Sequence, residues 1–204
     1  VRKTGVLAIT EPEAGSDVAK GMHTTAEKVD GGWKLNGTKR WIGNATWSDY
    51  AVIYARDIAD DQVKGFVVDT SAEGYRAELM ENRIALRAVQ NAEIHLTDCF
   101  VPDADKLEGA NTFKDTNKVF KSARATVGWQ AVGLQMGALD ATLDYADERE
   151  QFGRKISSFQ INQSKLATML GNLIASESMM YTLNRMQDRD ADHNEHSALA
   201  KAQV

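Results

Sequence analysis

The stretch AEIHLTDCFVP, residues 92–102, decides the fold class because the spacing of apolar residues changes where it ends. Its β-branched and aromatic residues are typical of a strand, and Pro102 closes it. After Pro102, apolar residues recur at steps of three and four, which is the period of an α-helix. The sequence therefore predicts an α+β chain, with a β domain over residues 1–105 and a helical domain over residues 113–204.

Short strand-like runs fill the first hundred residues. Gly, Asp and Asn separate them, and DGG at residues 30–32 is a tight-turn signal. No helical pattern intervenes, so we expect an antiparallel β-barrel or sandwich. The runs are TTAEKV (24–29), WKLNG (33–37), YAVIYAR (50–56), GFVVD (65–69) and AEIHLTDCFV (92–101).

Two amphipathic patterns occupy the second hundred residues, separated by a break at Gly153. Their period predicts helices of a four-helix-bundle type, with Met and Leu side chains in the core. Ser197 is the expected cap of a third helix, after the polar stretch 188–196. The predicted core positions are Val132, Met136, Leu139, Leu143 and Ala146 in the first helix, and Met169, Leu173, Ser176, Met180 and Leu183 in the second.

Composition argues against several classes of protein. A net charge of -5 without a Lys/Arg-rich face disfavours nucleic-acid binding. No apolar run approaches about 18 residues, so we expect no membrane span. Cys99 is the one cysteine, which excludes a disulfide within the chain and fits a reducing cytoplasm. The opening Val1 and the closing SALAKAQV both read as cuts within a larger protein.

The loop TEPEAGSD, residues 10–17, is the first candidate site. Gly15 permits close approach of the backbone, and Thr10 and Ser16 offer hydroxyls beside main-chain amides, which suits a phosphate or a flavin oxygen. A plain structural turn explains the same residues. Glu11 and Asp17 would repel a phosphate, so we expect these acids to point outward and to hold the loop.

Two further segments each have a structural and a functional interpretation. In NGTKRWIGNA (36–45), Trp41 is either a half-buried strand residue or a platform for a planar ring. In DEREQFGRKISSFQ (147–160), Arg149 either complements a helix dipole or binds a pyrophosphate. The residues alone leave both alternatives open.

Other kinds of site lack their motifs. The histidines, at positions 23, 95, 193 and 196, do not show metal-ligand spacing, so we expect no metal site. The sequence contains no Gly-x-Ser-x-Gly motif, P-loop or Gly-x-Gly-x-x-Gly fingerprint. Nucleotide binding by a Rossmann unit is therefore not expected.

The order of three motifs resembles the acyl-CoA dehydrogenase family. These motifs are ITEPEAGSDV, LNGTKRWIGNA and EREQFGRKISSFQ, and the resemblance covers essentially the whole chain. Within the family, KRWIGNA, LRAVQNAEI and SARATVGWQAVG are similar both to glutaryl-CoA dehydrogenases and to the short-chain acyl-CoA oxidases of plant peroxisomes. The resemblance implies the middle β domain and the first part of the C-terminal helical bundle, without the N-terminal helical domain.

The resemblance also implies FAD as the cofactor and a homotetramer. The segment 7–16 would line the isoalloxazine ring and the phosphates, and Trp41 would pack on the flavin. Arg149 and Gln160 would contact the adenosine diphosphate half across a subunit interface, with Phe152 nearby. The full set of implied FAD-binding residues is Leu7, Ile9, Thr10, Ser16, Trp41, Ile42, Gly43, Arg149, Phe152 and Gln160.

The acyl-CoA substrate is implied to contact Ser16, Ser122, Ala123 and Arg124, with Arg124 as the charged contact. Some relatives carry the catalytic base at the position of Ala123, and no Asp or Glu occurs here between Asp115 and Asp140. We therefore expect the general-base Glu beyond Val204, and this chain alone to be inactive. Gly43 departs from the Thr or Ser of many relatives, whose hydroxyl can bond flavin N5.

The implied activity is α,β-dehydrogenation of glutaryl-CoA or a short-chain acyl-CoA, with an electron-transfer flavoprotein as the acceptor. Two alternatives stay open: an oxidase that uses oxygen, and a relative that binds FAD or acyl-CoA without catalysis. The expected location is a bacterial cytoplasm, or a mitochondrial or peroxisomal matrix.

Overall fold

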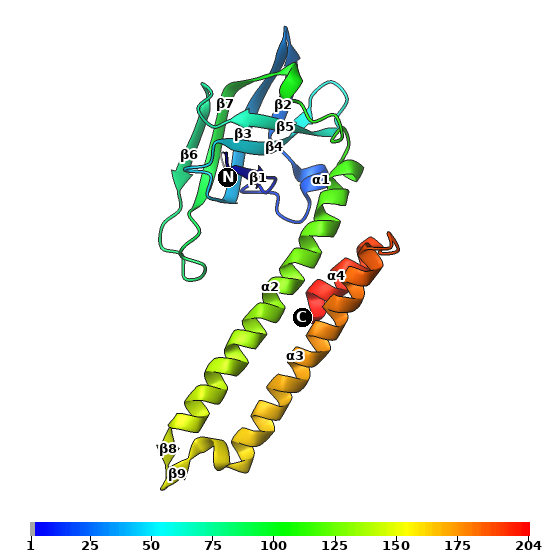
Figure 1. Cartoon of the computed structure of the whole chain (residues 1–204). Coiled ribbons are helices and arrows are strands. Elements are labelled where there is room, and N and C mark those ends of the chain that lie inside the picture. The colour runs from blue at the N-terminus through cyan, green and yellow to red at the C-terminus, as the bar shows by residue number, and fades with distance from the viewer. Residues whose placement is uncertain (1–2) are drawn as a thin grey trace. The chain divides into compact units, whose positions relative to one another are not determined.

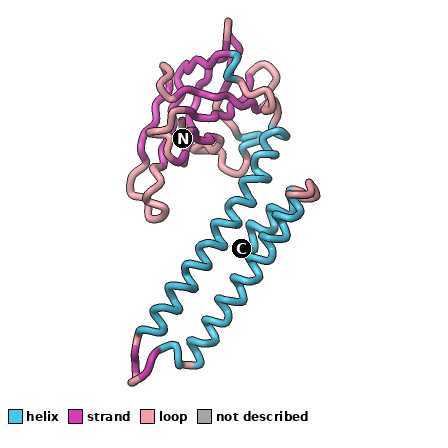
Figure 2. The backbone as a smooth tube through the Cα atoms, in the orientation of Figure 1, coloured by secondary structure: helices cyan, strands magenta, loops and turns pink. Residues whose placement is uncertain are grey.

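The computed structural model describes residues 3–204 and divides the chain into two compact units. The β unit comprises Val1–Thr116 and the helical unit comprises Asn117–Val204. Strands fill the first and helices fill the second, as Figures 1 and 2 show. The predicted order, a β domain followed by helices, is confirmed.

The β unit is one curled sheet. Its strand order is β1-β4-β2-β3-β7-β6, and β5 pairs with β4 off this path (Figure 1). Most pairs are antiparallel, as predicted, but β1 and β2 each run parallel to β4, which the sequence pattern did not indicate. The strands are β1 (Gly5–Ala8), β2 (Thr25–Val29), β3 (Gly32–Gly43), β4 (Tyr50–Asp57), β5 (Val63–Asp69), β6 (Tyr75–Leu79) and β7 (Asn91–Pro102), with a short helix α1 (Val18–Gly21) after β1 and a 3-10 turn η1 (Asp103–Asp105) after β7.

The sheet buries alternate residues on its inner face because side chains of a strand point to opposite sides. Ala92, Ile94 and Leu96 of β7 are buried in this way. Trp33 and Phe66 meet in the same core, with ring centroids 5.3 Å apart. Gly31 closes the β2–β3 hairpin with φ 73°, a conformation that glycine adopts without strain.

The helical unit begins within a long helix. Its elements are α2 (Phe113–Glu148), the short strands β8 (Glu150–Gln151) and β9 (Arg154–Lys155), a 3-10 turn η2 (Ile156–Ser158), α3 (Gln160–Gln187) and α4 (Asn194–Gln203). Gly128 lets α2 and α3 approach closely, because a Cβ there would lie 2.5 Å from Met180 Sδ. No helix in the described part of the chain is long and apolar enough to span a membrane.

The helical core follows part of the predicted pattern. Val132, Leu139 and Ala146 are buried on α2, as are Leu173, Ser176, Met180 and Leu183 on α3, and Met169 packs against them. Met136 and Leu143, in contrast, are each 45% exposed. Residues seven apart lie on the same side of a helix. Val132, Leu139 and Ala146 therefore form one buried row, whereas Met136 and Leu143 form a neighbouring row that is exposed.

Ser197 does not cap a helix, contrary to our expectation. It is buried inside α4, and the N-cap is His193, whose backbone N–H donates to His196 Nδ1 at 2.9 Å. The helix begins one turn earlier than predicted because two histidines form the reciprocal capping box.

Candidate functional site

The loop after β1 is held from inside by Glu11. One carboxylate oxygen, Oε1, accepts hydrogen bonds from Lys39 Nζ at 2.8 Å and the Thr24 backbone N–H at 2.9 Å. The other, Oε2, accepts the His23 backbone N–H at 2.6 Å. Glu11 holds the loop, as expected, but it points inward, since the residue is only 4% exposed. Asp17 remains exposed.

Burial and the contacts between the two partners change both pKa values, in opposite directions for each group. It lowers the pKa of Lys39 to about 8, although the charge and hydrogen bond of Glu11 oppose the shift. Burial alone would raise the pKa of the Glu11 carboxyl, but Lys39, Thr24 and His23 together hold it below its ordinary value. The charged form of Glu11 is thus stabilised by Lys39 and by two backbone N–H groups.

Trp41 is an exposed, conformationally strained aromatic. Its φ is 64°, a left-handed conformation that costs energy in a non-glycine residue, and 55% of its surface is exposed. A break in the β3–β7 register between Lys39 and Ile42 turns it outward. The Arg40 guanidinium lies 5.3 Å from the indole centroid. Trp41 is thus a strand residue of β3 with slightly more than half of its surface open, and an open indole face suits a planar ring.

The bulge and the loop meet through their main chains. The Arg40 N–H donates to Thr10 O at 2.8 Å, so Thr10 lies directly beside the bulge that carries Trp41. Among the described residues, the hydroxyls of Thr10 and Ser16 make no hydrogen bond, and Leu7 is exposed while Ile9 is buried. An exposed indole beside a loop with accessible hydroxyls fits a flat ligand with polar edges, as a flavin is.

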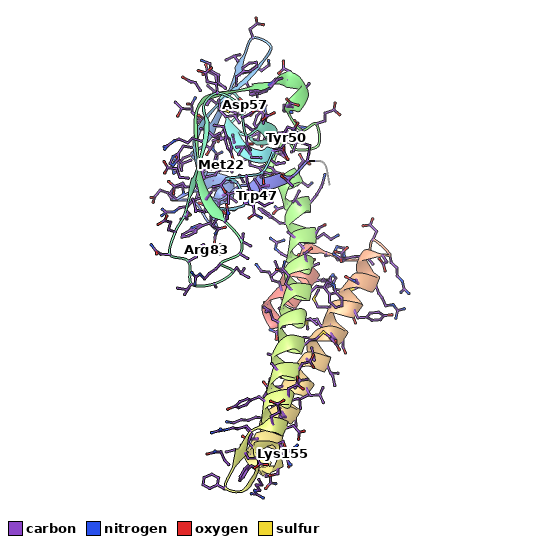
Figure 3. All side chains as sticks on the ribbon, turned by 60° about the vertical axis from the view of Figure 1, so that its left-hand side comes forward. Met22, Trp47, Tyr50, Asp57, Arg83 and Lys155 are labelled. Carbon is purple, nitrogen blue, oxygen red and sulfur yellow. The ribbon has the colours of Figure 1, made fainter. Side chains whose placement is uncertain are left out.

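Gly43 has a steric reason for its lack of a side chain. A Cβ at Gly43 would lie 3.0 Å from Val89 Cγ1, closer than most such contacts. Its neighbour Ile42 is buried, and Asn44 donates its N–H to Gln90 O at 2.6 Å. The β6–β7 loop, which also carries Arg83 (Figure 3), therefore packs directly against this position.

A second candidate surface lies where α2 turns into α3. Phe152 is 91% exposed at the tip of the β8–β9 hairpin, with φ 54°. Arg149, Arg154 and Lys155 flank it and are exposed, and Gln160 opens α3 (Lys155 is labelled in Figure 3). Exposed guanidinium groups beside a helix N-terminus fit an anion such as a diphosphate.

Of the four predicted substrate contacts, Ser16 lies in the β unit, and the other three lie elsewhere in the helical unit. Ser122 and Ala123 are exposed on the first turns of α2, and the Arg124 guanidinium lies 5.8 Å from the Phe120 ring. At a rise of about 1.5 Å per residue, Ser122 and Arg149 are about 40 Å apart along the helix. Within one helical unit, the predicted substrate contacts near Ser122 and the predicted FAD contact Arg149 are therefore far apart.

Sequence reasoning missed Lys39 as an organising residue, although a signal was present. Leu35, Gly37 and Lys39 have the same parity along β3, so a lysine occupies an inward position of a half-buried strand. Such a lysine requires a buried partner. Within residues 3–204 no cluster of three His, Cys, Asp or Glu residues could hold a metal ion.

Comparison with known proteins matches both units. Residues 6–99 match the family model of the acyl-CoA dehydrogenase middle domain, and residues 113–204 match that of the acyl-CoA dehydrogenase C-terminal domain. The benzylmalonyl-CoA dehydrogenase of Aromatoleum aromaticum is 33% identical over 98% of this chain and 53% of its own length. A subunit of the caffeyl-CoA reductase–Etf complex of Acetobacterium woodii is 34% identical over 98% of this chain and 54% of its own.

The fold is also similar to that of a solved acyl-CoA dehydrogenase structure. The glutaryl-CoA dehydrogenase of Mycobacterium smegmatis in complex with FADH2 superposes with a TM-score of 0.93 at 31% identity, over 97% of this chain and 50% of that one. The chain thus spans about half the length of the proteins it matches. Two successive family domains cover most of it in the order that the motifs predicted. The chain belongs to the acyl-CoA dehydrogenase family.

Proposed function

We propose that the protein containing this chain dehydrogenates an acyl-CoA thioester between its α and β carbons, with FAD as the cofactor. The observation that carries the proposal is Trp41. A left-handed backbone keeps a large aromatic exposed beside the loop 10–16, which costs stability and gives a flat binding surface in return. The FADH2 complex of a structural relative supports a flavin as the ligand of that surface.

The residues of the β unit then have distinct roles toward the flavin. Leu7 and the loop up to Ser16 would line the ring and the phosphates, with the Thr10 hydroxyl as a hydrogen-bond partner of the ring. Trp41 would pack against the ring, and the main chain at Ile42 and Gly43 would contact its edge. Bound FAD would supply the acceptor for the β hydride.

Arg149, Phe152 and Gln160 would bind the adenosine diphosphate half of FAD. Arg149 lies about 40 Å along the helix from Ser122, which favours contact with the cofactor of a neighbouring subunit. That arrangement requires a homo-oligomer, and we propose a tetramer. The chain's own Arg149 would then complete a site on its neighbour.

The substrate is proposed to be glutaryl-CoA or a short-chain acyl-CoA, in contact with Ser16 and with Ser122, Ala123 and Arg124. The relatives act on acyl-CoA thioesters by name, and one belongs to a complex with an electron-transfer flavoprotein. We accordingly propose such a flavoprotein as the electron acceptor, in a bacterial cytoplasm or an organelle matrix.

The general base is proposed to be a Glu beyond Val204. Position 123 is an alanine, and the first half of α2 carries no Asp or Glu between Asp115 and Asp140. The same observation favours the one alternative of another class, a protein that binds FAD and acyl-CoA without catalysis. The chain by itself is expected to be inactive in either case.

The test uses the full-length protein under anaerobic conditions. Its flavin is mixed with glutaryl-CoA or butyryl-CoA, and absorbance near the flavin maximum is followed before and after air is admitted. Bleaching by either thioester supports dehydrogenation, and the faster one identifies the acyl class. A fast return of colour with peroxide indicates an oxidase, whereas a slow return indicates a dehydrogenase. Bound flavin that neither thioester bleaches would favour the non-catalytic alternative.

A further inference from the structure

One buried ion pair joins the loop after β1 to the end of β3. Glu11 Oε1 lies 2.8 Å from Lys39 Nζ, and the two side chains are 2% and 0% exposed. On either side of it, Lys39 Nζ donates to Ile9 O at 3.2 Å and the Arg40 N–H donates to Thr10 O at 2.8 Å. Three consecutive loop residues are therefore bonded to two consecutive strand residues.

The same carboxylate fixes a third segment. The backbone N–H groups of His23 and Thr24, immediately before β2, both donate to Glu11. The loop itself is closed by the Glu11 N–H, which donates to Ala14 O at 3.0 Å. Glu11 is thus the point where the loop, the start of β2 and the end of β3 converge.

The proposed flavin contacts are direct neighbours of these bonds. Thr10 lies between Ile9 and Glu11, and Trp41 lies two residues after Lys39 in a left-handed conformation. A strained residue persists only where its surroundings over-determine its geometry. The ion pair, the Lys39–Ile9 bond and the Arg40–Thr10 bond connect the bulge to the loop.

Stability alone does not account for charged residues at these positions. Taking two ions out of water is costly, and apolar residues of similar size often replace a buried pair without loss of stability. A charged pair, however, forms directional hydrogen bonds, which apolar side chains lack. The directionality points to a geometric role.

We propose that Glu11 and Lys39 are positioning residues for the flavin, which lock the Thr10 loop and the Trp41 bulge into one rigid surface. The proposal rests on the proposed function, because the surface is assigned to FAD there. Neither residue touches the cofactor in this assignment; both act through Thr10 and Trp41.

The decisive variant is the neutral pair Glu11→Gln/Lys39→Met in the full-length protein. The glutamine keeps one acceptor oxygen, for the Thr24 N–H, while its NH2 group lies toward the His23 N–H. The methionine fills the lysine's volume, so thermal stability without FAD should return part of the way from that of Glu11→Gln toward that of the parent. The FAD dissociation constant should nevertheless rise about tenfold, with a changed circular dichroism band of the bound flavin. Lys34→Met, an exposed lysine on the same strand, is the matched control and should leave both unchanged.

Recovery of both stability and the flavin signals in the neutral pair would overturn the proposal, because the ion pair would then be structural alone. A parent protein that binds no FAD would contradict the proposed function instead. A second measurement needs no variant: amide exchange in the FAD-free parent. The amides of His23, Thr24 and Arg40 should open at one common rate if Glu11 and Lys39 make one rigid surface, and unrelated rates would overturn the proposal.

Discussion

The β unit and the helical unit bury their apolar residues to different extents. In the β unit, Phe66 and the buried residues of its core are at most 7% exposed, and the most exposed apolar residues, Ile84 and Leu86, lie in a loop. In the helical unit, Leu134 is 75% and Ile161 is 68% exposed, although both lie within regular helices. The β unit thus contains its own hydrophobic core, whereas the helical unit leaves apolar helix faces that a further surface would stabilise.

The largest expected effect tests this difference directly. Phe66→Ala should cost about 3–5 kcal/mol of unfolding free energy, because it leaves a cavity beside Trp33. Leu134→Ala removes a mostly exposed side chain and should cost about 0.5 kcal/mol or less in this chain. Urea unfolding of both variants gives the comparison. A large loss for Leu134→Ala in the full-length protein, but not in this chain, would show that another surface covers that face there.

The buried ion pair gives the next largest effect. Glu11→Gln should cost about 3 kcal/mol, because it leaves the Lys39 charge buried without its counter-ion. Lys28→Met, which removes the exposed pair with Asp103, should cost less than about 1 kcal/mol. Equal losses in the two variants would mean that burial of the pair has no energetic consequence.

The same pair predicts a dependence of stability on pH. The folded pKa of Glu11 lies below its ordinary value, so its contribution is complete above the unfolded pKa and is lost as pH falls through the folded one. The parent should therefore lose stability in acid more steeply than Glu11→Gln, which has no carboxyl to protonate. Unfolding free energies between about pH 6 and pH 3 measure the two slopes. Parallel slopes would contradict the lowered pKa.

A change at Trp41 should lower the affinity for FAD and leave the free energy of unfolding nearly unchanged. Trp41→Gly relieves the left-handed strain but removes the ring that Arg40 stacks on, so the unfolding free energy without FAD should stay within about 0.5 kcal/mol of the parent. FAD affinity should fall about tenfold, since the planar platform is gone. Trp47→Gly, an equally exposed tryptophan in the following turn (Figure 3), is the control. Unchanged FAD affinity in Trp41→Gly would remove Trp41 from the site.

The helical unit should contribute less to the same binding. Arg149→Lys keeps the charge and loses the bidentate fork, so FAD affinity of the full-length protein should fall about threefold. Arg189→Lys, in the turn after the C-terminal end of α3, is the control and should leave FAD affinity unchanged. An effect of Arg149→Lys that is the same in monomeric and oligomeric fractions would argue against a contact across subunits.

The sequence predicted local features better than long-range ones. The switch at Pro102 and the periodic stripes of Leu173, Met180 and Leu183 follow from spacing, and the structure confirms them. The left-handed Trp41 could not be predicted, because it arises from the register of β3 against β7, whose partners are about fifty residues apart in the chain. Likewise the direction of Glu11 depends on Lys39, which the fold brings beside it.

The position of Gly43 illustrates the same limit and yields the smallest predicted effect. From the sequence, Gly43 is a missing hydroxyl near flavin N5, whereas the structure adds that Val89 fills the space a side chain would need. Gly43→Thr alone should therefore displace Val89 and weaken FAD binding slightly. Gly43→Thr/Val89→Ala makes room for the hydroxyl, and one added hydrogen bond worth about 0.5–1 kcal/mol corresponds to a shift of roughly 10–20 mV in the two-electron potential of the bound flavin. Redox titration of the double variant against Val89→Ala measures that shift, and identical potentials would show that position 43 does not reach the flavin.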